Sequence, residues 1–476
     1  MPIKKISFIV LSLFILTRLS TQSILISPDI SIKNDFSYFV LAHPNGSFSL
    51  LRDKSFKISF QTLFPNFEWS IEKNIELPGK KWRLLDFFEN QNDIDIFYVS
   101  KTDEEYNLNK ITYNAQAEIL NHRPLFEGVT VSINENLKIQ NSTDKNWIAI
   151  GFNDLNNEKH LLLYNRPQDS VYYAISLAKI AKDDNISIHE VELSNEGIIY
   201  VFGRLNESTF SKKKNQTIVS KIDLLGIKFP NVILPFEDIY FMNGYAKIDD
   251  VTKYLSIGGL YSDKNNQTPK GYVICYLKPD YSLSEPAFVP FSTELLKEWN
   301  GNSKKSILSN SELNTRQIEF SKDSGCLIFY ENTKELSRRP YFSSSDPTGA
   351  YASKWFDYYF DDIVIASFDK NGKLNWDRVL HKRQYSQDDE GLFSSFFIFR
   401  TNAILRILFN DAISSEGTVS EYLLKPNGDH IRKSILNTSY KNLNLRFKDA
   451  IELDAQSVLV PSENNGKLNL VKIIFD

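Results

Sequence analysis

Short runs of apolar residues recur along the chain and alternate with polar segments and turn residues. Eight of these runs are rich in aromatic and β-branched residues, and most begin about 50 to 60 residues apart, with two wider gaps in the middle. They begin at Tyr38, Asp95, Trp147, Ile198, Tyr254, Cys326, Ile404 and Val458. Further strand candidates surround most of them, so the pattern predicts a unit of four strands that repeats.

Turn residues separate the strands in a recurring layout. The stretch FDKNGKLNW (residues 368–376) places Asn371-Gly372 between two alternating runs, which predicts a hairpin with a type I′ turn. A calcium loop of the EF-hand type would need a Glu at its twelfth position, and counting from Asp369 that position is Leu380. Asn427-Gly428 repeats the layout, and weaker copies begin at Leu51, Thr112, Lys221 and Tyr276.

Four strands in each unit of this length are typical of β-propeller blades. We therefore expect an all-β fold, a single β-propeller of eight four-stranded blades, with seven blades as the alternative. The last unit lacks an outer strand, and residues 23–32 (SILISPDISI) offer a strand that could complete it and tie the two ends of the chain together. The best helix candidate is residues 291–299, between two units.

The first residues have the pattern of a signal peptide. Lys4 and Lys5 precede an apolar run over residues 6–16, which is shorter than the roughly 20 residues of a spanning helix. Cleavage is expected near Ser23, which gives a signal peptide over 1–23 and one propeller domain over 24–476. The protein is then secreted or periplasmic, on the exterior side of the cell envelope. No later segment is long and apolar enough to span a membrane.

Composition changes this picture little. The net charge of −4 gives no electrostatic case for nucleic acid, and 13% aromatic residues favour β structure. Cys275 and Cys326 each lie in an apolar run and are interpreted as buried free thiols, since two cysteines make neither a disulfide framework nor a zinc site.

The long loops are expected on one face of the propeller, formed by the links between second and third strands and by the crossovers between blades. The longest is an insertion over residues 331–360 in the sixth unit. It is rich in Arg and aromatic residues, which dominate binding hot spots. The predicted binding residues are Arg338, Arg339, Tyr341, Trp355, Tyr358 and, from the next loop, Arg383. The alternative is that these rings only pin the loop to the scaffold.

The loop over residues 381–391 (HKRQYSQDDEG) gathers acids beside a histidine. His381, Asp388 and Glu390 are candidates for acid–base catalysis, and Asp361, Asp362, Asp388 and Asp389 for a calcium site. A solvated charged loop is the simpler interpretation, with no cofactor. No nucleophile elbow, HExxH helix or P-loop occurs.

Residues 361–396 (DDIVIASFDKNGKLNWDRVLHKRQYSQDDEGLFSSF) resemble segments of uncharacterised secreted repeat proteins of Bacteroidetes. The resemblance covers one blade and its exit loop, and implies an exported, propeller-like protein without implying an activity.

The sequence therefore favours an exported, monomeric propeller that binds a protein or carbohydrate partner through one loop-rich face. Two alternatives remain. One is a glycan hydrolase or lyase that uses the 381–391 loop, and the other is a structural part of an envelope or adhesion assembly.

Overall fold

The computed structural model describes residues 22–54, 57–102, 105–130, 139–156, 158–177, 185–206, 216–236, 239–263, 268–300, 312–338, 355–401, 403–411, 413, 417–438 and 442–475. The chain divides into two compact units. The first contains residues 1–34, 63–70 and 389–476, and the second contains residues 35–62 and 71–388. Arg339 and Tyr341, two of the predicted binding residues, lie outside the described residues.

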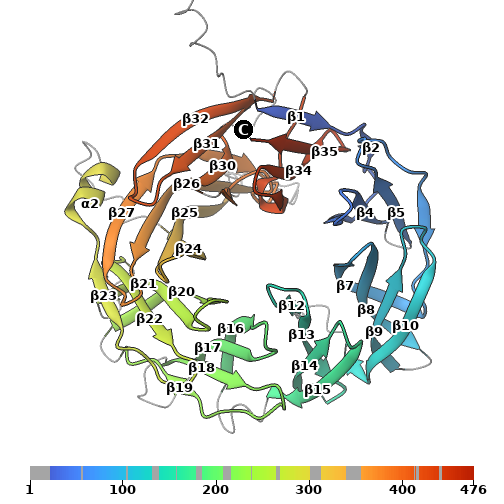
Figure 1. Ribbon diagram of the computed structural model, residues 1–476, viewed down its shortest axis with the longest axis horizontal. Coiled ribbons are helices and arrows are strands. Elements are labelled where there is room, and N and C mark those ends of the chain that lie inside the picture. Colours follow the sequence, from blue (N-terminus) through green and yellow to red (C-terminus); the bar gives the residue numbers. More distant parts are fainter. Residues whose placement is uncertain are drawn as a thin grey trace, which may run out of the picture. The chain divides into compact units, whose positions relative to one another are not determined.

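The second unit contains six antiparallel sheets that follow one another along the chain (Figure 1). The first three are β3 (Ser37–Ala42), β4 (Phe48–Asp53), β5 (Ile58–Leu63) and β6 (Lys73–Ile75); β7 (Lys80–Asn90), β8 (Asp93–Thr102), β9 (Glu105–Tyr113) and β10 (Ile119–Glu127); and β11 (Val129–Thr130), β12 (Ile139–Asn141), β13 (Trp147–Asp154), β14 (Lys159–Asn165) and β15 (Ser170–Ser176). In the third sheet, β11 and β12 both pair with β13, so the first strand is split.

The other three sheets of this unit are β16 (Asn185–Leu193), β17 (Ile199–Asn206), β18 (Gln216–Ile222) and β19 (Val232–Ile233); β20 (Ile239–Ile248), β21 (Leu255–Asp263), β22 (Gly271–Leu277) and β23 (Ala287–Pro290); and β24 (Glu312–Phe320), β25 (Cys326–Arg338), β26 (Trp355–Phe368), β27 (Leu374–Leu380) and β28 (Gln384–Gln387). The predicted helix is confirmed as α2 (Thr293–Asn300), which lies between β23 and β24.

The first unit holds the remaining two sheets. One is β29 (Phe397–Arg400), β30 (Leu405–Asn410), β31 (Thr418–Leu424) and β32 (His430–Asn437); the other is β33 (Ile451–Asp454), β34 (Ser457–Asn464), β35 (Lys467–Ile474), β1 (Ser23–Ile26) and β2 (Ile30–Ser31), with the short 3₁₀ helix η4 (Phe447–Asp449) before β33. β1 pairs with β35 from Ser23 opposite Ile474 to Ile26 opposite Val471. The predicted completion of the last sheet by the N-terminal strand is confirmed.

Eight sheets of this kind, each with four successive strand positions, make the chain an eight-bladed β-propeller fold. The expectation of eight blades is confirmed, and the alternative of seven is wrong because the last sheet has its own first strand, β33. Whether one domain spans residues 24–476 stays a prediction.

Buried side chains hold consecutive blades together. Each of six apolar clusters draws on two neighbouring sheets of the same unit. Between the fifth and sixth blades, for example, Leu260 and Tyr272 pack with Ile318, Ile328 and Val364. Successive side chains along a strand point to opposite faces of the blade. Both faces need apolar side chains, which is why the strand runs are almost continuously apolar. Cys275 and Cys326 are buried free thiols in these clusters, as predicted.

The turn between the third and fourth strands is the same in seven blades. The amide of the fourth turn residue donates to the carbonyl oxygen of the first at 2.8 to 3.0 Å, and the fourth residue has a positive φ. The seven pairs of first and fourth residues are Phe64 and Phe67, Asn114 and Ala117, Arg166 and Asp169, Asp223 and Gly226, Lys278 and Tyr281, Asp369 and Gly372, and Lys425 and Gly428.

This turn corrects the prediction of type I′. Gly372 has φ +79° and Gly428 has φ +85°, but Asn371 and Asn427 are not in the left-handed region. Each of these two hairpins therefore has a type I turn followed by one left-handed residue. In blade six the side chain of Asp369 also accepts the amides of Asn371 and Lys373 and supports that geometry. Asn465-Gly466, between β34 and β35, does have the two positive φ angles of type I′.

Two strand assignments also differ from the sequence pattern. The run at Tyr38 is the first strand of its blade, whereas the other seven runs are second strands. The weaker copy of the turn that the sequence places at Leu51 leads into the link between second and third strands. In this blade the recurring turn is Phe64–Phe67, which contains no Gly or Asp. Neither the length nor the composition of any helix in the described part of the chain suits a membrane span.

Candidate functional site

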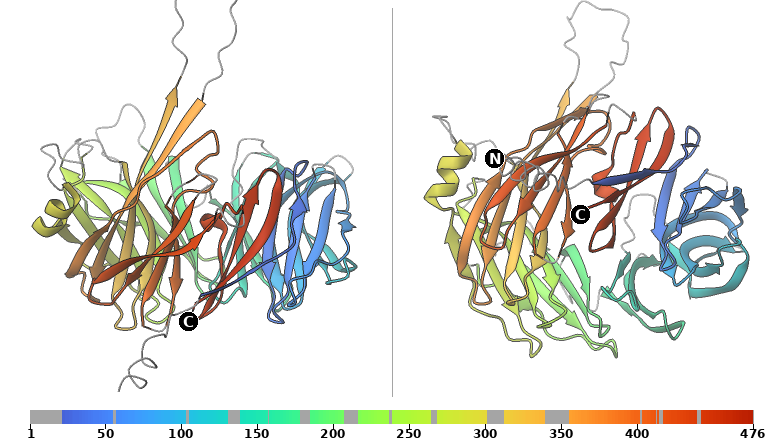
Figure 2. Two further views of the ribbon diagram at one scale, coloured as in Figure 1. Left: turned by 90° about the horizontal axis from the view of Figure 1, so that it is seen from above. Right: turned by 45° about the horizontal axis from the view of Figure 1, so that its top comes forward.

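The second and third strands of blade six extend past the other strands of their sheet as a long hairpin, β25 and β26 (Figure 2). Beyond the bulge at Asn332, six cross-strand pairs run from Thr333 opposite Phe360 to Arg338 opposite Trp355. β28, from the loop after the blade, adds a third strand against residues 357–360. The described part of the predicted insertion therefore extends the blade, with β28 as a third strand, and is not an irregular loop at its base.

A buried ion pair lies under this extension. Lys382 Nζ is 2.7 Å from Glu331 Oε1, and both side chains are fully buried. Arg316 Nε donates to the other oxygen of Glu331 at 2.8 Å, and Lys382 also donates to the carbonyl oxygen of Phe360 at 2.7 Å and to Gln384 Oε1 at 2.9 Å. Burial lowers the pKa of Lys382, and the charge of Glu331 opposes that shift. These contacts join β24, β25, β26 and the segment before β28 at one point.

A second polar group lies further out on the hairpin. The Asp357 side chain is buried, forms an ion pair with Arg338 and accepts a hydrogen bond from Tyr385 at 2.9 Å. This bond raises the pKa of Tyr385. The rings of Tyr359 and Tyr385 lie 5.2 Å apart, so aromatic contacts and charge together fix β28 on the hairpin.

A pocket of about 330 Å³ opens beside the base of the hairpin. It is lined by Asn332, Thr333, Lys334, Leu336, Tyr359, Asp361 and Arg383. Asp361 keeps one carboxyl oxygen buried without a hydrogen-bond partner among the described residues. Burial raises the pKa of Asp361, and the neighbouring charge of Asp362 adds to that shift. The pocket thus offers a carboxyl group, a guanidinium group and an aromatic ring to a ligand.

Four predicted binding residues lie in the described part of this site, in different roles. Arg338 holds Asp357, and Trp355 faces Arg338 at the outermost described pair of the hairpin. The Tyr358 ring stacks with Phe356 at 6.4 Å and is half-buried. Arg383 lines the pocket. The structure thus brings these side chains to one hairpin and its base.

His381 and Asp388, two of the candidates for catalysis, have different partners. His381 Nδ1 lies 3.2 Å from Asp362 Oδ1, and Trp299 of α2 donates to the other oxygen of Asp362 at 3.0 Å. Asp388 exchanges hydrogen bonds with the backbone of Phe356 and so caps the added strand. Glu390 belongs to the first unit, in the crossover to β29. The catalytic interpretation of these residues stays a prediction.

The four candidate calcium ligands are likewise engaged separately. Asp361 lines the pocket, Asp362 binds Trp299 and His381, Asp388 caps β28, and Asp389 accepts the amide of Gly391 at 2.9 Å. Among the described residues, one group of three side chains has metal-ligand spacing, Asp154, Glu158 and His160. Asp154 there accepts backbone amides of its own turn and the His160 ring at 3.1 Å, which accounts for the group without an ion.

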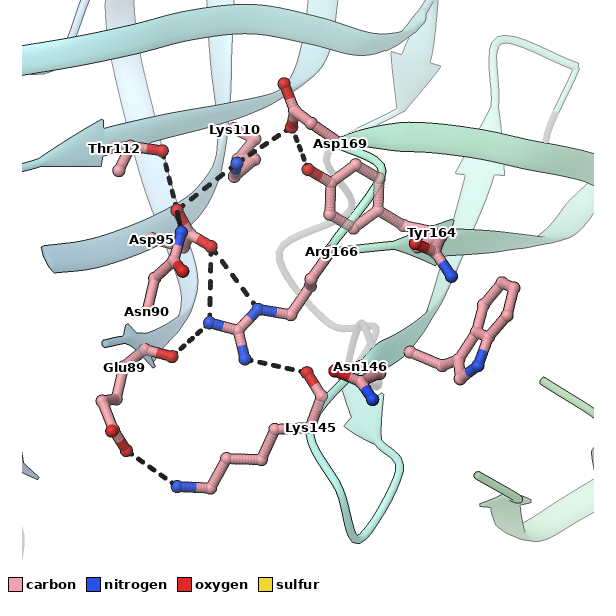
Figure 3. A network of polar contacts seen from close by, with 12 residues as sticks. Glu89, Asn90, Asp95, Lys110, Thr112, Lys145, Asn146, Tyr164, Arg166 and Asp169 are labelled. Atoms are coloured by element: carbon pink, nitrogen blue, oxygen red, sulfur yellow. Dashed lines mark hydrogen bonds and ion pairs between the residues drawn. The ribbon is translucent and has the colours of Figure 1, made fainter. Parts of the chain in front are cut away.

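Another buried charge network joins the second and third blades (Figure 3). Asp95 is fully buried, accepts a hydrogen bond from Thr112 at 2.7 Å and pairs with Lys110 and Arg166 at 3.4 Å. Lys110 in turn pairs with Asp169 at 2.9 Å, and Tyr164 donates to the same carboxylate. Each central charge has a partner, so the network is a link between blades.

Sequence reasoning missed the residues that anchor the hairpin. Glu331 and Lys382 read as members of charged loops, and nothing in their spacing marked them as a fully buried pair. Asp357 and Tyr385 were likewise not singled out. The sequence carried no signal for the added strand, because β28 buries the polar residues Gln384 and Ser386 and exposes Tyr385, the reverse of hydrophobic alternation.

No protein-family model matches the chain, and no curated protein is significantly similar to it in sequence. Solved β-propellers are similar in fold. The β-propeller domain of the trilobed protease from Pyrococcus furiosus has 7% identity and a TM-score of 0.37, over 84% of this chain and 98% of that one. Sqt1 from Saccharomyces cerevisiae has 9% identity and a TM-score of 0.45, over 93% and 97%. Prolyl oligopeptidase B from Galerina marginata has 10% identity and a TM-score of 0.39, and the chain spans 55% of its length.

Proposed function

We propose that the protein is an exported, monomeric binding protein that recognises a protein partner through the extended hairpin of blade six and the pocket at its base. The observation that carries this proposal is the anchoring of the hairpin. A link between two strands needs no buried charges, and burying Glu331 and Lys382 has a desolvation cost that their contacts must offset. These contacts hold the hairpin in a fixed geometry, which lowers the entropy cost of binding.

The chemistry of the hairpin suits a polypeptide surface. Trp355, Phe356, Tyr358 and Tyr359 are all partly exposed on β26, and aromatic residues with Arg make up most binding hot spots. The pocket adds charges of both signs, Asp361 opposite in sign to Arg383 and Lys334, which can pair with side chains or backbone groups of a partner. A carbohydrate partner at this hairpin is the alternative.

The test compares the wild type with two variants. The first carries Tyr358→Ala and Arg383→Ala together. In the second, Asn-Gly replaces residues 339–354 between the paired residues Arg338 and Trp355. The wild type and the two variants, each carrying a photo-crosslinker, are applied to the exported protein fraction of the source cells and to a glycan array. We expect a saturable protein partner whose affinity falls at least tenfold in both variants, with unchanged thermal unfolding.

Lys322→Ala, at an exposed turn position of the same blade, is the matched control for loss of a positive charge and should bind like the wild type. Equal capture by the wild type and both variants would overturn the hairpin as the recognition site. A glycan signal that depends on the hairpin, without a protein partner, would mean that the partner is a carbohydrate and not a protein.

A further inference from the structure

A larger pocket lies at the opposite end of the sixth blade, between it and the fifth. It has a volume of about 520 Å³, and its described lining belongs to short turns and strand ends of these two blades. Its lining comes from the β20–β21 and β22–β23 turns of blade five and from the β24–β25 and β26–β27 turns of blade six. Because the extended hairpin is a link between second and third strands, this pocket is a separate site.

Aromatic rings form the apolar part of the pocket. Tyr254, Tyr276 and Phe320 contribute their side chains, and the rings of the two tyrosines lie 6.5 Å apart at 52°. Tyr276 is nearly buried and donates to the carbonyl oxygen of Asp369 at 3.2 Å, so this ring is fixed by the recurring turn of blade six. Tyr254 and Phe320 are half-buried and leave part of each ring exposed.

Polar groups surround these rings. Ser256, Ser284 and Ser324 bring hydroxyl groups, and Asn371 brings a side-chain amide that makes no hydrogen bond within the described part of the chain. Lys278 and Lys370 add ammonium groups to the lining. Donors and acceptors thus encircle an aromatic surface.

The charges that line the pocket cancel. Lys278 and Lys370 are opposed by Asp249 and Glu285, two of each sign. Asp249 is engaged by its own turn, since it accepts the Thr252 hydroxyl at 2.6 Å and the Val251 amide at 3.1 Å. A strongly charged ligand would gain little net attraction here, whereas a neutral ligand with many hydroxyl groups could use both the ammonium and the carboxylate groups as hydrogen-bond partners.

We propose that this pocket between blades five and six binds a neutral pyranose unit of a saccharide. The exposed faces of Tyr254 and Phe320 would receive the apolar face of the sugar ring, and Lys278, Lys370, Asn371 and Glu285 would hydrogen-bond its hydroxyl groups. The proposal is independent of the hairpin, and it gives the protein a carbohydrate ligand on the side of the short turns.

The test is saturation-transfer difference NMR on the full chain with named probes: maltotriose, cellotriose and the N-acetylglucosamine trimer as neutral sugars, trigalacturonate as a charged one, and a tetra-alanine peptide. We expect transfer to pyranose ring protons of at least one neutral probe. Asn371→Ala and Lys278→Met should each weaken that binding at least fivefold. Tyr254→Ala should abolish it, and Tyr254→Phe should retain it.

Asn427→Ala is the matched control, because Asn427 has the position of Asn371 in the same turn of blade seven and does not line the pocket. Should Tyr254→Ala fail to fold, the Asn371→Ala and Lys278→Met variants, at exposed or half-buried positions, carry the test. Absence of transfer from every neutral probe, a response to trigalacturonate or the peptide alone, or binding that survives the pocket variants would each overturn the proposal. Loss of the hairpin would leave this binding unchanged.

Discussion

Glu192 on β16 is a partly buried carboxyl group beside a second one, Glu190. Its Oε2 accepts the amide of Ile248 at 3.4 Å, and Glu190 accepts the amide of Ala246 at 2.9 Å, so both acids hold the backbone of β20. Burial, and then the charge of Glu190, raises the pKa of Glu192 from its ordinary value near 4.5 to about 8; Asp250 adds to that shift and Lys247 opposes it. The protonated form is therefore favoured in the folded protein.

This residue predicts a pH dependence of stability. Between about pH 4.5 and 8 the folded state binds a proton at Glu192 that the unfolded state does not bind. The free energy of unfolding should therefore fall as the pH rises through this window, by up to about 1.4 kcal/mol for each pH unit from this group. Above pH 8 both states are ionised and the contribution of Glu192 is lost.

Urea unfolding of the wild type and of Glu192→Gln at pH 5, 6.5 and 8 measures this slope. The glutamine keeps an oxygen acceptor for Ile248 and cannot titrate, so the free energy of unfolding of the wild type should fall relative to that of Glu192→Gln as the pH rises from 5 to 8. Parallel pH profiles for the two proteins would contradict the assignment.

The recurring turn is the element that shapes the short-turn ends of the blades. Its fourth residue is left-handed in all seven cases, whether it is Gly226, Gly372 and Gly428 or a residue with a side chain such as Phe67 or Tyr281. A left-handed residue other than glycine costs about 1 to 2 kcal/mol, so four blades bear a strain that three avoid. The blade interfaces must hold these turns in place.

Gly372→Ala and Gly428→Ala should therefore each destabilise the protein by about 1 to 2 kcal/mol. At Gly372 a new Cβ would also lie 3.1 Å from Ala287 Cβ, a contact that any side chain would share. Gly372→Asn is the matched variant, because asparagine tolerates the left-handed region better and should lose less. Differential scanning calorimetry gives the comparison, and an equal loss for Ala and Asn would mean that space, and not φ, limits the position.

At the scale of the whole molecule, the two ends of the chain meet in one sheet. β1 pairs with β35, and β2 pairs with the start of the same strand. The Ser27 hydroxyl oxygen accepts a further hydrogen bond, from the Leu470 amide at 2.9 Å. Ile24 and Ile26 pack against the core that blade eight shares with blade seven. This sheet can form only after the last strand is present, and β1 then covers the outer edge of β35.

A truncated chain that begins after residue 32 lacks residues 22–32 and should therefore expose β35 as an unpaired edge. We expect a loss of at least about 2 kcal/mol, from roughly 1 kcal/mol for each half-buried isoleucine and the lost strand pairing, and concentration-dependent association. Thermal unfolding and light scattering measure the two effects. A chain that begins at Gln22 and keeps β1 is the control, and equal behaviour of the two truncated chains would show that the N-terminal strand does not support the fold.

The sequence by itself determined the all-β class, the number of blades, helix α2 and the strand that completes the last sheet. Each of these depends on local alternation and on repeats, which a linear pattern records. It also located the extension of blade six. It did not determine the turn type, because Asn-Gly favours type I′, whereas in blades six and seven only the glycine of the pair has a positive φ.

Only the tertiary structure decided which charges are buried and which surfaces are hollow. Glu331 and Lys382 are 51 positions apart along the chain and look like ordinary surface residues, yet they meet fully buried because three strands and a crossover converge on them. The pocket between blades five and six is assembled from four turns. The sequence pattern marked two of them, at Tyr276 and at Asn371-Gly372, but did not show that they line one pocket. Such juxtapositions depend on how blades pack against one another, a property that no short stretch of sequence contains.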